Sequence, residues 1–122
     1  LLSPGAVGGV WLRPHDESEW LEVEAPDDIL VVTIGDLLEL WSGGYFVSTP
    51  HKVVNASGQE RYSFPFFIVP RHDVVVAPLI DCQPGFERAP VPVGPVSREV
   101  WRTNWPEAVP EDTGFDLGTL PD

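Results

Sequence analysis

Hydrophobic and polar positions near the start of the chain alternate over short runs, as they do in half-buried β-strands. The runs 10–13 and 20–24 are rich in β-formers and are separated by a polar turn, so they predict two strands joined as a hairpin. The next run, 29–34, is apolar except for Thr33 and is mostly β-branched. A run of this kind predicts a central strand that is buried on both faces.

A short helical connector is predicted after this third run. Gly35 ends the strand, and Asp36 is a residue type that caps helices. The apolar segment 37–41 that follows has room for only one or two helical turns. The sequence therefore predicts a connector here and no separate layer of helices.

Extended runs then return, separated by turn residues. The runs are 45–48, 51–54 and 60–69. The last is the longest strand candidate, and Pro65 inside it has no N–H, which predicts a bulge or an unpaired position there. Several short strands with Gly- and Pro-rich turns and almost no helix predict an all-β fold, an antiparallel sandwich or barrel.

The character of the chain changes at Pro70, because nine of the fourteen prolines lie between there and the end. Only 74–76 and 97–102 resemble regular elements in this part. From Pro84 onward the pattern predicts an irregular Pro-rich arm. Its apolar anchors would be Phe86, Trp101 and Trp105.

Composition and charge narrow the class of protein. The formal net charge is −12, with seven acidic residues in 1–28 and five in 107–122, which argues against a phosphate-binding surface for nucleic acid. No run approaches the roughly 18 apolar residues of a membrane helix. A single cysteine, Cys82, cannot form an internal disulfide, so a cytoplasmic location is the expectation. The oligomeric state stays open.

The chemistry-bearing motifs lie in the middle of the chain, in the order Gly35-Asp36, Ser48-Thr49-Pro50-His51-Lys52-Val53-Val54 and Arg61-Tyr62-Ser63. Because side chains alternate along a strand, Arg61 and Ser63 are expected to share a face. A guanidinium beside a hydroxyl makes a charge-assisted site for a carboxylate.

These motifs resemble the C-terminal half of the iron(II) and 2-oxoglutarate-dependent oxygenases of the isopenicillin N synthase-like group. The resemblance extends from about residue 8 to residue 79. It implies a double-stranded β-helix, or jelly roll, of which residues 1–83 form the C-terminal part, followed by a Pro-rich acidic tail at 84–122.

The resemblance also implies a set of site residues. His51 would be the distal ligand of a two-His, one-carboxylate iron(II) site, although Lys52 stands where the family usually has Arg and Pro50 where it has an apolar residue. Arg61 and Ser63 would bind the distal carboxylate of the co-substrate 2-oxoglutarate. Phe67, on the same strand face, is the aromatic residue expected to lie beside the substrate.

The remaining two ligands of this family come from a His-x-Asp motif about fifty to sixty residues before the distal His. Counting back from His51 reaches a point just before Leu1, so we expect that motif upstream of this chain, which contains no methionine. The pairs His15-Asp16 and His72-Asp73 are adjacent in the sequence, without the intervening residue of a His-x-Asp motif. We predict that both lie in solvated turns.

The implied activity is hydroxylation or desaturation of a small organic substrate by dioxygen. Two alternatives remain open at this point. One is an iron oxidase of the same group that does not use 2-oxoglutarate. The other is an inactive jelly-roll fragment whose acidic ends dock on a basic partner.

Overall fold

The computed structural model describes residues 2–3, 8–15, 19–24, 26 and 29–108. These residues belong to two compact units. The first unit comprises residues 1–39 and 46–68, and the second comprises residues 40–45 and 69–122. We predicted from the sequence that the oxygenase domain ends at residue 83. The two compact units do not test this boundary, which stays a prediction.

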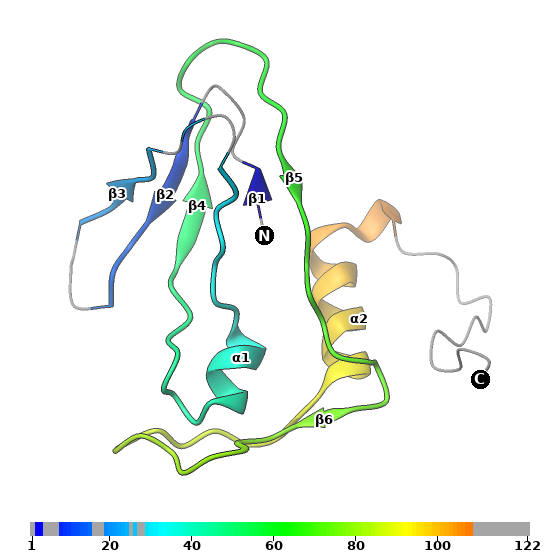
Figure 1. The fold of residues 1–122 in the computed structure, drawn as a ribbon. Coiled ribbons are helices and arrows are strands. Elements are labelled where there is room, and N and C mark those ends of the chain that lie inside the picture. The colour runs from blue at the N-terminus through cyan, green and yellow to red at the C-terminus, as the bar shows by residue number, and fades with distance from the viewer. Residues whose placement is uncertain (1, 4–7, 16–18, 25, 27–28, 109–122) are drawn as a thin grey trace. The chain divides into compact units, whose positions relative to one another are not determined.

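A three-stranded antiparallel sheet lies in the first unit, with the order β3-β2-β4 (Figure 1). Its strands are β2 (Val10–Leu12), β3 (Leu21–Glu22) and β4 (His51–Val53). The predicted hairpin is confirmed, since β2 and β3 pair with Trp11 opposite Glu22. β4 then lies along the other edge of β2.

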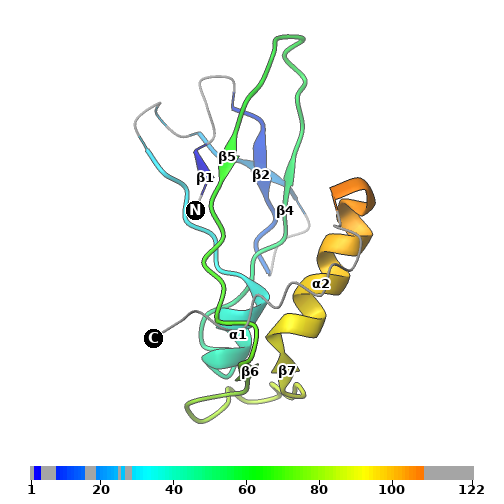
Figure 2. The same cartoon turned by 90° about the vertical axis from the view of Figure 1, so that its right-hand side faces the viewer.

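A second pair of strands in this unit joins β1 (Leu2–Ser3) to β5 (Phe64–Pro65) in antiparallel fashion (Figure 2). The long strand predicted over 60–69 is therefore paired over only two residues. Pro65 lies inside β5, where its missing N–H limits the ladder. The large apolar side chains of this segment are 64% to 79% exposed: Tyr62, Phe64, Phe66, Phe67 and Ile68.

The predicted central strand at 29–34 is wrong for the described structure. Only Val31 forms an isolated bridge, and Leu30 and Val32 are 60% and 68% exposed. A β-branched run becomes a buried central strand only where strands flank it on both edges. None of the described sheets contains this run.

The predicted helical connector is confirmed as α1 (Asp36–Trp41). The Gly35 carbonyl accepts hydrogen bonds from the N–H groups of Leu38, at 3.0 Å, and Glu39, at 3.1 Å. Gly35 is therefore the capping position, and Asp36 lies one residue further on, in the first turn. A carboxylate there is favoured by the positive end of the helix dipole.

The second unit pairs β6 (Val75–Val76) with β7 (Val91–Pro92). Helix α2 (Val93–Asn104) follows β7 directly, and a short 3-10 turn, η1 (Pro106–Ala108), follows α2 (Figure 2). Among the described residues of this unit, three side chains are fully buried and form its core. They are Leu40, Val76 and Val93.

Helix α2 corrects the expectation of an irregular arm. Pro95 lies in its first turn, where N–H groups have no partner within the helix, so a proline is tolerated. The next proline, Pro106, follows Trp105 and disfavours helical backbone there. The prolines therefore bracket the helix, and the all-β prediction describes the three small sheets but not α2. Neither of the described helices has the length and apolar character needed to span a bilayer.

Candidate functional site

His51 begins β4 and is held in register by backbone bonds on both sides. Within the ladder it lies opposite Leu12. The Arg13 N–H donates to the Pro50 carbonyl at 3.0 Å, and the Val54 N–H donates to the Gly9 carbonyl at 2.8 Å. The backbone at His51 is therefore held by strand pairing that extends beyond β4 at each end.

The imidazole ring of His51 is oriented by its own strand. Its Nδ1 lies 3.1 Å from the Thr49 carbonyl oxygen. Since a carbonyl can only accept, Nδ1 is the donor in this contact, and in the neutral imidazole Nε2 then carries the lone pair. A neutral imidazole whose second nitrogen donates to a carbonyl is the usual form of a metal-binding histidine. His51 is exposed, so Nε2 is accessible.

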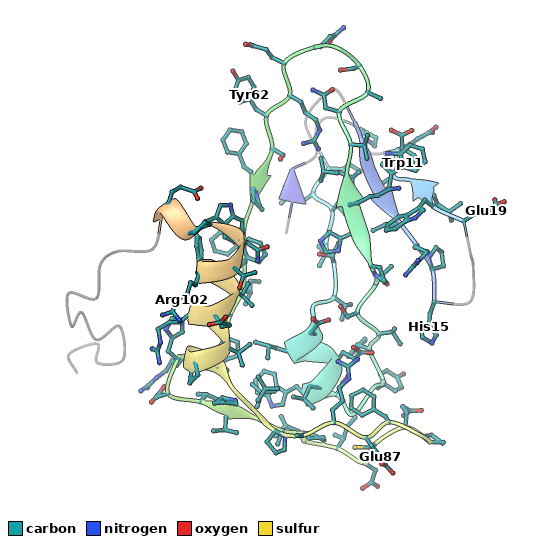
Figure 3. All side chains as sticks on the ribbon, turned by 180° about the vertical axis from the view of Figure 1, so that it is seen from behind. Trp11, His15, Glu19, Tyr62, Glu87 and Arg102 are labelled. Carbon is teal, nitrogen blue, oxygen red and sulfur yellow. The ribbon has the colours of Figure 1, made fainter. Side chains whose placement is uncertain are left out.

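The opposite face of the same ladder carries aromatic and basic side chains. Residues opposite one another across an antiparallel pair share a face, so Trp11 and Lys52 lie on the face away from His51. The Lys52 Nζ lies 4.2 Å from the Trp20 ring centroid and 5.9 Å from that of Trp11 (Figure 3 labels Trp11). The Arg13 guanidinium lies 5.4 Å from the Trp20 ring. The two Lys52 contacts join β4 to the β2–β3 hairpin, and the Arg13 contact lies within the hairpin.

Replacing Lys52 by Met is expected to lower the free energy of unfolding by about 1 kcal/mol, because both cation–π contacts are lost while the aliphatic stem is kept. Lys52→Arg keeps a cation over the rings and should unfold like the wild type. Chemical denaturation of the full-length protein measures both. Equal stability of Lys52→Met and wild type would show that the contacts contribute nothing.

Arg61 and Ser63 lie together, as strand periodicity predicts. Both are half-buried, whereas Tyr62 between them and Phe64 after them are exposed. An Arg61 terminal N–H donates to the Ser63 Oγ at 3.2 Å. The Arg61 Nε–H donates to the Gly8 carbonyl at 2.7 Å. A guanidinium held in this way, with a hydroxyl beside it, has the chemistry to bind a carboxylate.

Phe67 does not continue this arrangement. It lies beyond β5 and is 70% exposed. Half-buried and exposed residues alternate from Arg61 to Phe64, but this alternation ends before Phe67. Its place beside a substrate stays a prediction.

The other histidines lie in turns. His15 is exposed in the turn after β2 (Figure 3), and Asp16 lies outside the described residues. His72 is half-buried and lies in the turn with Asp73, whose carboxylate pairs with Arg71 at 2.7 Å. Within the described part of the chain, no three His, Cys, Asp or Glu side chains come together as a metal site. The role of His51 as an iron ligand therefore stays a prediction.

Comparison with known proteins shows the family to which the chain belongs. The sequence profile of the 2OG-Fe(II) oxygenase superfamily matches residues 1–70, which include His51, Arg61 and Ser63. The chain belongs to the 2OG-Fe(II) oxygenase superfamily. Iron(II) and 2-oxoglutarate are the cofactor and co-substrate of this family.

Curated relatives support the same assignment. The chain is 32% identical over 89 residues to feruloyl CoA ortho-hydroxylase F6H1-1 of Ipomoea batatas, covering 73% of this chain and 25% of the relative. It is 41% identical over 69 residues to the 2-oxoglutarate-dependent dioxygenase traH of Penicillium crustosum, covering 55% of this chain and 20% of the relative. It is 38% identical over 76 residues to gibberellin 2-beta-dioxygenase 6 of Oryza sativa subsp. japonica, covering 62% and 21%.

The chain thus spans only 20% to 25% of the length of these three relatives. No solved structure matches it significantly. The described residues fit the family's two small ligands in part: an accessible imidazole nitrogen at His51 suits iron(II), and the paired guanidinium and hydroxyl suit a carboxylate.

Proposed function

We propose that the protein is an iron(II)- and 2-oxoglutarate-dependent oxygenase that uses dioxygen to hydroxylate or desaturate a small organic substrate. In this proposal His51 is one iron ligand, and a His-x-Asp motif outside this chain supplies the others. Arg61 and Ser63 bind the distal carboxylate of 2-oxoglutarate, and Phe67 lies beside the substrate.

The observation that carries the proposal is the anchored pair Arg61 and Ser63. The guanidinium is held by the Gly8 carbonyl at 2.7 Å and joined to the Ser63 hydroxyl at 3.2 Å, within the segment that matches the family. A surface arginine has no need of such anchoring. An arginine that must receive a carboxylate in one orientation benefits from it, because less side-chain entropy is lost on binding.

The side chains of this unit would perform binding and orientation. Arg61 neutralises and aligns the carboxylate, and Ser63 adds a second hydrogen-bond donor beside it. His51 contributes the Nε2 atom, while its Nδ1 faces the Thr49 carbonyl and orients the ring. When bound, iron(II) and 2-oxoglutarate would supply the activation of dioxygen that protein side chains cannot perform.

We also propose that the first unit is part of a jelly roll. Support comes from its short antiparallel strands and from two apolar segments that stay largely exposed in the described chain, 29–32 and 62–68. Exposed apolar segments of this kind are the ones that further strands of a jelly roll would cover.

Measuring succinate tests the proposed function. The full-length protein with iron(II), dioxygen and 2-oxoglutarate is expected to release succinate and carbon dioxide. Chelation of the metal should stop the release, and added iron(II) should restore it. Oxidation of a substrate without succinate would instead identify the oxidase of the same group that does not use 2-oxoglutarate. If the protein neither binds iron(II) nor releases succinate, the result would favour the inactive interaction module.

A further inference from the structure

The peptide group between Gly8 and Gly9 is hydrogen-bonded at both ends. Its carbonyl, from Gly8, accepts the Arg61 Nε–H at 2.7 Å. Its N–H, from Gly9, donates to the Glu22 Oε1 at 3.2 Å. The next carbonyl, from Gly9, accepts the Val54 N–H at 2.8 Å. One turn therefore connects the β2–β3 hairpin, the extension of β4 and the guanidinium of the candidate carboxylate site.

The two glycines differ in the space around them. Both have positive φ, 67° at Gly8 and 84° at Gly9, which a residue with a side chain adopts only with strain. A Cβ at Gly8 would meet only the Glu22 Oε1, at 3.7 Å. A Cβ at Gly9 would overlap the Val54 carbonyl oxygen and lie 3.6 Å from the Arg61 Nε. Gly9 is also buried.

We propose that Gly9 is a positioning residue for the 2-oxoglutarate carboxylate, because its missing side chain lets the turn hold the Arg61 guanidinium in place. This inference rests on the proposed function. Any side chain at Gly9 must push the turn away from Val54, and the Gly8 carbonyl moves with it since both glycines share one peptide plane. The guanidinium that donates to that carbonyl then moves as well.

A comparison of two ligands isolates this effect. The full-length protein, loaded with iron(II) without dioxygen, is titrated calorimetrically with 2-oxoglutarate and with 2-oxobutanoate, which lacks the distal carboxylate. Gly9→Ala is expected to reduce the preference for 2-oxoglutarate by about tenfold or more, since a displacement on the order of 1 Å can cost a hundredfold at such sites. Affinity for 2-oxobutanoate should stay within about threefold of the wild type.

Gly58→Ala is the matched control. Gly58 also has a positive φ, 70°, and a Cβ there would meet nothing within 4 Å, so this variant introduces the same kind of backbone strain without an overlap. Its preference for 2-oxoglutarate should stay within about threefold of the wild type. Equal loss of preference in Gly58→Ala and Gly9→Ala, or none in Gly9→Ala, would overturn the inference.

A second pair of variants keeps the test informative if Gly9→Ala does not fold. Glu22→Ala removes the acceptor of the Gly9 N–H, whereas Glu22→Gln keeps an oxygen there. Glu22→Ala should weaken the preference for 2-oxoglutarate, and Glu22→Gln should restore it; equal preferences in both would count against the inference. Arg61→Ala separates failure of the proposed function from failure of this inference. If Arg61→Ala keeps the wild-type preference for 2-oxoglutarate, the proposed carboxylate site itself is wrong.

Discussion

In the full-length protein, His51→Ala is expected to lower the affinity for iron(II) by about a hundredfold or more and to stop succinate release. Loss of a hydrogen-bond partner of a metal ligand alone typically costs ten- to hundredfold, so loss of the ligand itself should cost at least as much. The exposed ring leaves little packing to lose, so the free energy of unfolding without metal should change by less than about 0.5 kcal/mol. Titration with iron(II) in the absence of dioxygen measures the affinity.

His15→Ala is the matched control for this prediction, because His15 is also an exposed histidine of the first unit but lies in a turn. It should bind iron(II) like the wild type. Unchanged iron affinity in His51→Ala would remove His51 from the metal site and would favour an interaction role for the chain.

Local signals in the sequence predicted the parts of the fold that depend on neighbouring residues. The hairpin between β2 and β3 follows from two short alternating runs and a polar turn, and α1 follows from Gly35 and an apolar segment too short for a longer helix. The pairing of Arg61 with Ser63 follows from the two-residue period of a strand. Each of these requires only a few consecutive residues.

Features that depend on distant partners were missed or misread. The run 29–34 has the composition of a central strand, yet in the described structure it forms only an isolated bridge at Val31 and joins no sheet. Helix α2 was missed because of the high proline content of this region. Proline disrupts the interior of a helix but is tolerated in its first turn. Two contacts join residues that are far apart in the sequence: Gly9 with Val54, and Lys52 with Trp20. Such contacts cannot be predicted from a pattern of neighbouring residues.

Replacing Arg61 by Leu is the second prediction with a large expected effect. It should weaken binding of 2-oxoglutarate by about a hundredfold, since hydrogen bonds to a charged group contribute roughly 1.5–3 kcal/mol each and tenfold corresponds to about 1.4 kcal/mol. Arg61→Lys keeps the charge but loses the planar fork that donates to Gly8 and Ser63, so its affinity should fall between those of Leu and wild type. Ser63→Ala removes one neutral donor and should have the smallest effect.

Iron affinity separates this effect from damage to the metal site. Arg61→Leu should bind iron(II) like the wild type, the reverse of the pattern expected for His51→Ala. Arg71→Leu is the matched control, because Arg71 pairs with Asp73 on the surface and is 74% exposed. A surface pair contributes little, so this variant should bind both ligands normally. If Arg61→Leu instead raises the KM of a carboxylate substrate and leaves 2-oxoglutarate binding unchanged, the guanidinium recognises the substrate and the co-substrate assignment is wrong.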